Sequence, residues 1–201
     1  MHAAPEAAVA IGPCTVGSVN AAIVVLNGGS SSGKSSIARC LQDLLGPTWL
    51  TLGVDDLIRA LPGGGEPPGA QPSIGFMPDG SVMVEEDFRL AEAAWYQGLA
   101  AIGRSGTGLI IDEVFLGGRF SQDRLAEALT DLAVMWVGVR CVPEVAASRE
   151  QGRPDRIVGM ARLQAERVHP GVRYDLVVDT THVSAPECAN SIVAHLLAPD
   201  D

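Results

Sequence analysis

The stretch that decides the fold is VVLNGGSSSGKSSIARC, residues 24–40. Within it a glycine is followed by four residues and then by glycine, lysine and serine, at Gly28, Gly33, Lys34 and Ser35. This spacing is that of a phosphate-binding loop, whose backbone N–H groups form a concave cradle for an anion. The stretch therefore predicts a site for the phosphates of a nucleotide.

The residues on either side of the loop fit the same structure. An apolar run at residues 21–26 predicts a strand that leads into the loop, and residues 35–44 predict a helix whose positive end faces the anion. Lys34 would reach the β- and γ-phosphates, and the Ser35 hydroxyl would bind Mg²⁺. We therefore expect ATP and Mg²⁺ as cofactors. The residues expected to hold the nucleotide are Gly28, Gly29, Ser30, Ser31, Ser32, Gly33, Lys34, Ser35, Ser36 and Arg149.

The single lysine of the chain supports this interpretation over a plain glycine- and serine-rich turn. Lysine and arginine together number 14, and Lys34 is the only lysine among them. A compact ammonium fits between phosphate oxygens, where the planar fork of an arginine fits poorly. The position of this lysine therefore favours phosphate binding.

Length and charge limit the classes of function. The 201 residues, 47% of them hydrophobic, suit one domain, which we place at residues 21–201. The net charge of −10 would repel nucleic-acid phosphates, so we expect no nucleic-acid partner. The four cysteines have no paired spacing, which argues against a zinc site and a disulfide framework; they are Cys14, Cys40, Cys141 and Cys188.

The sequence gives no sign of a membrane or secretory segment. No apolar run approaches the roughly 20 residues that a membrane helix needs. Residues 1–20 have neither a positive start nor a long hydrophobic centre, so they are a poor signal peptide. We expect a cytoplasmic protein in which residues 1–20 form a loose extension.

Apolar runs and amphipathic stretches alternate beyond the loop, as in a parallel sheet covered by helices. The predicted class is α/β: a P-loop kinase-like three-layer sandwich with a five-stranded parallel sheet, helices on both faces and an arginine-bearing lid. The expected strands are 21–26, 49–54, 108–112, 134–140 and 174–178. The expected helices are 35–44, 56–60, 86–103, 122–129, 143–151, 156–167 and 185–197. Residues 61–80, rich in proline and glycine, are expected to form an irregular binding loop.

Carboxylates follow two of the predicted strands at the edge where such sheets bind ligands. Asp112 and Glu113 end the third strand, in GLIIDEVFLGG, which resembles a Walker B element. Asp112 would then bind Mg²⁺ together with Ser35. The plainer alternative is a carboxylate that caps a helix.

Two aspartates, Asp55 and Asp56, follow the second strand and are candidates for the group that orients the acceptor hydroxyl. We prefer Asp55 as the catalytic base, since Asp56 is explained more simply as a charge at a helix N-terminus. The three histidines considered are not assigned to catalysis. His182 follows the last strand, in a loop expected near the adenine, and His169 and His195 have no suitable spacing.

Three arginines lie in SREQGRPDRIVG, on either side of a Gly-Arg-Pro break between helical stretches. They are Arg149, Arg153 and Arg156. This composition suits a lid that folds over the nucleotide, with Arg153 and Arg156 stabilising charge on the transferred group. The alternative is a solvated corner in which these arginines pair with Glu150 and Asp155.

The acceptor side carries few basic residues. Arg59 is the only one between Ile58 and Phe88, whereas an anionic acceptor usually needs arginines. This segment therefore predicts a neutral acceptor. Residues that could form apolar walls for it, or equally the protein core, are Phe76, Met77, Val82, Met83, Phe88, Trp95 and Tyr96.

From about residue 23 to residue 196 the chain resembles the chloramphenicol phosphotransferase family, small P-loop kinases that phosphorylate a primary hydroxyl of the antibiotic. The similar segments are LNGGSSSGKS, WLTLGVDDLI, IIDEVFLGG, MWVGVRC, GRPDRIVGMA and YDLVVDTTH, in that order. The resemblance implies ATP at residues 28–35, Asp55 as the base, and Arg153 and Arg156 in the lid.

The chain departs from that family at four places. The loop at residues 62–73 is longer and richer in proline and glycine, and the N-terminal extension has no counterpart. Glu113 stands where a second aspartate is expected, and Asp56 where a serine is expected. The resemblance therefore supports the assignment of the catalytic groups more fully than it supports the identity of the substrate.

The leading hypothesis is an ATP-dependent O-phosphotransferase for a hydroxyl of a small neutral amphipathic molecule, with chloramphenicol as the first candidate. Kinases of another alcohol or of a nucleotide-sugar are alternatives. So are an ATPase in which Glu113 activates water, and a regulatory module that only binds nucleotide. No guanine-recognition motif follows the fourth strand, which argues against GTP.

Overall fold

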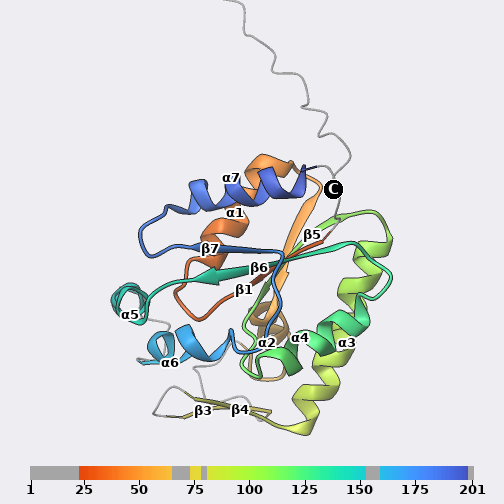
Figure 1. The fold of residues 1–201 in the computed structure, drawn as a ribbon. Helices are drawn as coiled ribbons and strands as arrows, with labels where there is room; N and C mark the ends of the chain where they lie inside the picture. Colours follow the sequence, from red (N-terminus) through yellow and green to blue (C-terminus); the bar gives the residue numbers. More distant parts are fainter. Residues whose placement is uncertain (1–22, 65–72, 78–80, 153–158, 199–201) are drawn as a thin grey trace, which may run out of the picture.

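The computed structural model describes residues 23–64, 73–77, 81–152 and 159–198. Its centre is a five-stranded sheet in the order β2-β5-β1-β6-β7 (Figure 1). Every neighbouring pair in this sheet is parallel. The strands are β1 (Ile23–Asn27), β2 (Trp49–Gly53), β5 (Gly108–Glu113), β6 (Val134–Arg140) and β7 (Leu176–Asp179). The five predicted strands are therefore confirmed.

Helices cover both faces of the sheet, which confirms the three-layer α/β class (Figure 1). The core on one face joins the sheet to α1 (Lys34–Leu45) and α7 (Ala185–Leu196). The core on the other face joins it to α3 (Glu86–Arg104) and α4 (Arg119–Ala128). Three further helices, α2 (Val54–Ala60), α5 (Pro143–Gln151) and α6 (Met160–Arg167), lie around the ends of the strands.

The sequence of β1 explains its central place. All five of its residues are buried. Val24 and Leu26 pack into the core with α1 and α7, while Ile23 and Val25 pack into the core with α3 and α4. A strand covered on both faces needs an uninterrupted apolar run, and IVVL supplies it.

The second strand ends one residue before the prediction. It ends at Gly53, and α2 begins at Val54. A carboxylate oxygen of Asp56 accepts a hydrogen bond from the Gly53 N–H at 2.8 Å, which satisfies a free amide at the start of the helix. Both Asp55 and Asp56 therefore lie in the first turn of α2.

The expectation of an irregular segment at residues 61–80 is wrong in part. Strand β3 (Ile74–Phe76) pairs antiparallel with β4 (Val82–Val84). Ile74 packs with Leu57 and Phe88, which gives the hairpin a small core of its own. Residues 65–72 of the proline- and glycine-rich stretch lie outside the described residues, as do the predicted extension at residues 1–20 and the C-terminal residues 199–201.

Three other helix starts differ from the prediction, the first being that of α1, which begins one residue early at Lys34. Helix α4 begins at Arg119, three residues before the expected start. The described part of the helix expected at 156–167 runs from Met160 to Arg167, after Gly159 in the left-handed region at φ 94°. Among the described residues, no helix is both long and apolar enough to cross a membrane.

Candidate functional site

The phosphate-binding loop joins β1 to α1 at the carboxyl edge of the sheet. Gly33 has φ 95°, a left-handed conformation that favours glycine, and α1 begins at the next residue. The Lys34 side chain turns back over the loop, where its Nζ donates to the carbonyl of Gly29 at 3.0 Å. The same Nζ lies 3.6 Å from a carboxylate oxygen of Asp112. The Lys34 ammonium thus lies between the loop backbone and Asp112.

Three serine hydroxyls of the loop are buried without a hydrogen-bond partner among the described residues. They are Ser30, Ser31 and Ser32. A buried hydroxyl without a partner is costly, so such groups point to a ligand that would complete them. Phosphate oxygens are acceptors of the right kind, and the residues present fit the phosphates of a nucleotide.

The loop leaves no room for larger residues at its first two glycines. A Cβ on Gly28 would lie 2.5 Å from the carbonyl oxygen of Val139, and one on Gly29 would lie 2.9 Å from the backbone of Gln164. Backbone oxygens and carbons cannot move away without shifting β6 or α6. These glycines are therefore required by close packing.

Ser35 and Asp112 meet as the magnesium hypothesis predicted. The Ser35 hydroxyl donates to a carboxylate oxygen of Asp112 at 2.8 Å. The contact forms because β1 and β5 pair in parallel, with Leu26 opposite Asp112. One carboxylate and one hydroxyl are hard oxygen ligands, and Mg²⁺ commonly takes its other ligands from water and phosphates. The described residues contain no group of three or more acidic, histidine or cysteine side chains placed to hold a metal.

The two candidate bases have different surroundings. Asp56 bonds the Gly53 N–H and pairs with Arg59 at 2.6 Å, so its carboxylate serves the start of α2. Asp55 is exposed in the same turn. Because Gly53 lies opposite Asp112 in the sheet, α2 begins beside the predicted magnesium ligands. The roles of Asp55, Ser35 and Asp112 stay predictions.

Glu113 is fully buried beside Asp112. Burial raises the pKa of its carboxyl to about 8, and the nearby Glu92 and Asp112 act in the same direction. The N–H of Val114 and the Lys34 ammonium oppose this shift. One carboxyl oxygen of Glu113 has no hydrogen-bond partner among the described residues.

Arg149 is attached to the loop through Thr180. Its guanidinium donates to the Thr180 carbonyl at 2.7 Å, and the Thr180 hydroxyl donates to the carbonyl of Ser32 at 2.6 Å. Glu150 is not a partner of this arginine, because its buried carboxylate accepts the N–H groups of Gly159 and Ala161 at 2.8 and 2.7 Å. The other two predicted lid residues, Arg153 and Arg156, lie outside the described residues, as does Asp155.

A buried asparagine before the loop was missed in the sequence. The Asn27 amide nitrogen donates to the Val168 carbonyl at 2.8 Å and to the Tyr174 hydroxyl at 2.6 Å, and its oxygen accepts the Phe115 N–H at 2.9 Å. Tyr174 in turn lies 2.7 Å from Nδ1 of His169. The Asn27 side chain thus connects the loop, the chain after β5 and the end of α6. The sequence signal for this role was a polar residue, Asn27, at the end of an otherwise apolar strand.

His169 is buried in this network, as a packing role would require, while His182 and His195 are exposed. Burial, together with the positive charges of Arg140 and Lys34, lowers the pKa of His169 to about 4. The imidazole is therefore neutral near pH 7, with Nδ1 available to accept the Tyr174 hydroxyl.

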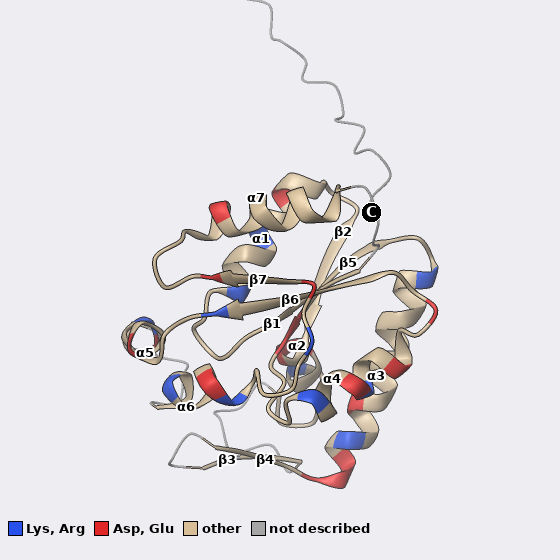
Figure 2. Cartoon of the chain, in the orientation of Figure 1, with Lys and Arg blue, Asp and Glu red and all other residues tan. Residues whose placement is uncertain are grey.

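A cavity of about 180 Å³ lies between the β3–β4 hairpin and α6, and its lining residue Gln164 bonds the Ser30 N–H of the phosphate loop. Figure 2 shows basic segments on α3, α4 and α6 around this region. Two arginines, Arg89 and Arg167, reach the cavity from outside the 58–88 segment. The lining residues are Ser81, Val82, Arg89, Leu116, Gly117, Leu163, Gln164 and Arg167.

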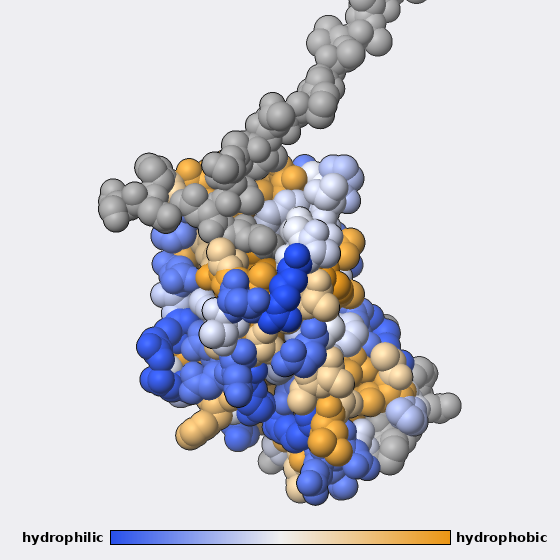
Figure 3. Space-filling model, turned by 90° about the vertical axis from the view of Figure 1, so that its right-hand side faces the viewer, coloured by the Kyte–Doolittle hydropathy of each residue, from blue (hydrophilic) through white to orange (hydrophobic). Residues whose placement is uncertain are grey.

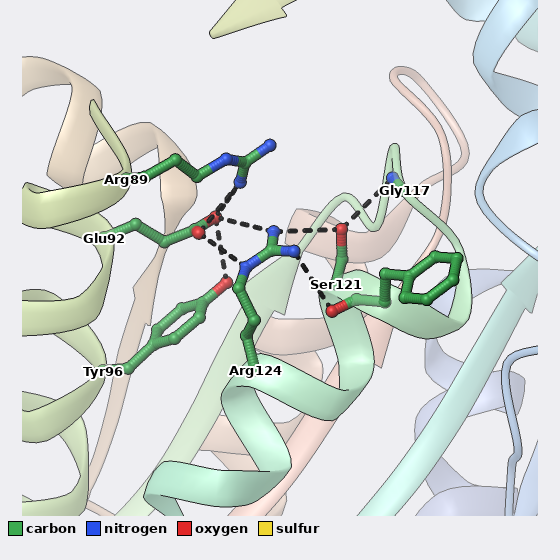
Figure 4. Close-up of polar contacts among 7 residues, drawn as sticks. Arg89, Glu92, Tyr96, Gly117, Ser121 and Arg124 are labelled. Carbon is green, nitrogen blue, oxygen red and sulfur yellow. Dashed lines mark hydrogen bonds and ion pairs between the residues drawn. The ribbon is translucent and has the colours of Figure 1, made fainter. Parts of the chain in front are cut away.

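Beside the cavity, the buried carboxylate of Glu92 forms ion pairs with Arg89 and Arg124 (Figure 4). Glu92 accepts from Arg89 at 2.9 Å and from Arg124 at 2.9 Å, and Tyr96 donates to it at 3.4 Å. Arg124 also donates to the Ser121 hydroxyl at 3.3 Å. This cluster was missed in the sequence, although the spacing of Arg89, Glu92 and Tyr96 on one helix was a signal for it.

The residues proposed as acceptor walls separate into several environments. Val82 lines the cavity, whereas Phe88 and Tyr96 belong to the core. Trp95 is partly buried against the core, and Met83 is exposed. On the face seen in Figure 3, apolar patches alternate with polar ones. The alternative of an ordinary core residue therefore holds for Phe88 and Tyr96.

Over residues 21–197 the chain matches a family model described as chloramphenicol phosphotransferase-like protein. The chain belongs to this family. A Mycobacterium tuberculosis H37Rv protein, provisionally named an O-phosphotransferase, is 30% identical over 188 residues, which cover 85% of this chain and 80% of that relative. The family resemblance found in the sequence is confirmed, and the chain is a phosphotransferase.

Solved structures share the fold. A gluconokinase from Sinorhizobium meliloti 1021 aligns with a TM-score of 0.61 and 21% identity, over 89% of this chain and 92% of that one. An APS kinase from Mycobacterium tuberculosis, in complex with AMPPNP and APS, aligns with a TM-score of 0.59 and 16% identity, over 90% of this chain and 100% of that one. At these identities the likeness establishes the P-loop kinase fold.

Proposed function

We propose that the protein transfers the γ-phosphoryl group of ATP to a hydroxyl group of a small molecule. The observation that carries this proposal is the set of three buried loop hydroxyls without partners, beside the Lys34 ammonium and the Ser35–Asp112 pair. These groups fit a nucleotide triphosphate with its metal ion. The family match and the AMPPNP in the related APS kinase structure support ATP as the donor.

Each group in the site has a distinct part in this reaction. The loop N–H groups and Lys34 bind the phosphates, and Ser35 and Asp112 would hold Mg²⁺, which supplies charge stabilisation when bound. Asp55, at the start of α2, orients the acceptor hydroxyl and accepts its proton late in the transfer. Arg153 and Arg156 are proposed to stabilise charge on the moving group, and Arg149 to hold the nucleotide beside Thr180.

An ATPase in which Glu113 activates water is the less favoured function. The Glu113 carboxyl is fully buried, and because its pKa is raised to about 8 it is mostly protonated at neutral pH and so cannot accept a proton from water. A module that only binds nucleotide would not need a second cavity beside the phosphate loop. Such a cavity is present.

The acceptor proposed first is a small amphipathic alcohol, with chloramphenicol as the named candidate, since the family model carries that name. The test is a panel of alcohols incubated with ATP and Mg²⁺, with the phosphate esters detected by mass spectrometry. We expect ADP release that depends on one alcohol of the panel. ADP release at the same rate with and without every alcohol would contradict the proposed function.

A further inference from the structure

The cavity of about 180 Å³ is made of segments that converge at the carboxyl edge of the sheet, where ligands of such folds bind. Leu116 comes from the chain after β5, only four positions beyond Asp112. Arg89 comes from the start of α3 and Val82 from the hairpin, while Gln164 and Arg167 come from α6. The cavity therefore lies next to the elements that carry the predicted metal ligands.

Gln164 connects this cavity directly to the phosphate loop. Its side-chain oxygen accepts a hydrogen bond from the Ser30 N–H at 2.9 Å, and the side chain is 4% exposed. Gly29 packs against the backbone of the same residue. One buried residue thus forms both a wall of the cavity and a support of the loop. A molecule in the cavity would be adjacent to the bound phosphates.

Among the described residues that line the cavity, two carry a guanidinium group and none carries a carboxylate. One nitrogen of Arg89 bonds both oxygens of Glu92 at 2.9 Å, which fixes the side chain, while its outer nitrogen points away from Glu92 (Figure 4). The side chain of Arg167, the last residue of α6, makes no ion pair or hydrogen bond with another described residue. A guanidinium is a planar fork that matches a flat group with two oxygens.

The rest of the lining is mostly apolar, from Val82, Leu116 and Leu163. A pocket of this kind takes the carbon part of a ligand against its apolar wall and orients it with few polar groups. Charge-assisted hydrogen bonds to arginine would then decide which alcohols bind well.

We propose that this cavity is the acceptor pocket and that Arg89 and Arg167 select alcohols carrying a planar two-oxygen group, such as a carboxylate or a nitro group, at the end remote from the reacting hydroxyl. This inference rests on the proposed function, because it assigns the second substrate of that reaction. It is argued from the side chains that line the pocket, whereas the expectation of a neutral acceptor came from the number of basic residues between Ile58 and Phe88.

Three isosteric primary alcohols test the proposal: 4-hydroxybutanoate, 3-nitropropan-1-ol and 4-methylpentan-1-ol. They share a three-carbon chain and end in a carboxylate, a nitro or an isopropyl group. Their dissociation constants are measured by calorimetry on the full chain with MgADP bound. We expect the carboxylate, the nitro compound or both to bind at least about ten-fold more tightly than the isopropyl compound, the size of one charge-assisted hydrogen bond.

Variants of two arginines on α6 make the test specific. Arg167→Met should remove about ten-fold or more of that preference and leave the affinity for ATP unchanged. Arg162→Met is the matched control, since Arg162 is on the same helix but pairs with Glu144 at 2.8 Å and does not line the cavity. The control should keep the preference. Arg89→Met should resemble Arg167→Met, and a urea titration will show whether loss of its Glu92 contact also costs stability.

The outcomes separate this proposal from the proposed function. Tighter binding of 4-hydroxybutanoate alone, relative to the isopropyl compound, supports a pocket for anions. Tighter binding of both 4-hydroxybutanoate and 3-nitropropan-1-ol supports a pocket for planar groups with two oxygens in general. Equal or tighter binding of the isopropyl compound would overturn the proposal. So would a preference that survives Arg167→Met, or no binding of any of the three while another alcohol stimulates ADP release. Absence of ADP release with every alcohol would refute the transfer reaction, and the binding order would still test the pocket.

Discussion

The phosphate side and the acceptor side of this molecule are built in different ways. The phosphate side takes most of its groups from nine consecutive residues, 27–35, and adds Asp112 through a single strand pair. The proposed acceptor side is lined by the hairpin, α3, the chain after β5, and α6, and its two arginines are far apart in sequence. A local site can be found from spacing alone. A dispersed site needs the fold.

The two sides also differ in how well their polar groups are satisfied. The loop serines are buried without partners among the described residues, whereas Glu92 on the acceptor side is bonded by Arg89, Arg124 and Tyr96. A ligand that supplies hydrogen bonds to unsatisfied buried groups removes a free-energy cost of the empty site. A satisfied cluster such as that of Glu92 provides a rigid wall. The following variants test this division, in order of expected effect.

The largest effect is expected on the phosphate side. Lys34→Met should lower kcat by about 10³-fold, the order expected when a positioned charge is removed from a transferring group. The free energy of unfolding should change little. Arg39→Met, at an exposed position of the same helix, is the control and should keep full activity. Full activity of Lys34→Met with an unchanged KM for ATP would contradict the phosphate-loop interpretation.

The largest effect on the free energy of unfolding is expected at Asn27, whose side chain connects the phosphate loop to the chain after β5 and to the end of α6. Asn27→Ala removes two buried hydrogen bonds, to Val168 and Phe115, and a partly buried one to Tyr174, and should lower the free energy of unfolding by about 3 kcal/mol. Urea titration measures this change. Asn190→Ala, at an exposed position of α7, should have almost no effect. An equal, small effect of both substitutions would mean that the Asn27 contacts do not hold the loop in place.

The proposed base gives a smaller, kinetic effect. Asp55→Asn should lower kcat by about 10²-fold, the usual contribution of a positioned base, with little change in affinity for ATP. Asp56→Asn should keep most activity and lose at most about 1 kcal/mol of stability, because Asp56 serves the start of α2. Transfer rates and melting temperatures of the two variants show which aspartate acts as the base. The reverse pattern would identify Asp56 as the base.

The pH dependence of stability should report on His169. Its pKa is about 4 in the folded protein and about 6.5 when exposed, so only the unfolded chain binds a proton between these values. The stability from this group is present above pH 6.5 and is lost as the pH falls towards 4, by about 2 kcal/mol between pH 7 and pH 5. His169→Gln should flatten this part of the profile. His195→Gln, at an exposed position, should not change it.

The sequence was sufficient where chemistry and spacing are local. Apolar runs such as IVVL identified the sheet, and the pattern from Gly28 to Ser35 identified the loop that the structure shows. It also placed Asp112 beside Ser35, because parallel strands bring their ends to one edge.

The sequence was insufficient where contacts join distant segments. The hairpin at residues 74–84 was missed because two strands of three residues give little periodic signal. The links from Asn27 to Tyr174 and from Ser30 to Gln164 span more than 130 residues. No spacing rule covers such distances, and for the same reason a count of basic residues in one segment could not show which arginines line the cavity.

The central claim is that the two sides act together to move a phosphoryl group onto an alcohol. The most direct measurement uses ATP labelled with ¹⁸O in its γ-phosphate, an alcohol that stimulates ADP release, and mass spectrometry of all phosphate-containing products. We predict that the label appears in an organic phosphate ester, one for each ADP formed, and that Asp55→Asn lowers this ester without diverting label elsewhere. Label found only in inorganic phosphate, formed at the same rate without the alcohol, would contradict the account.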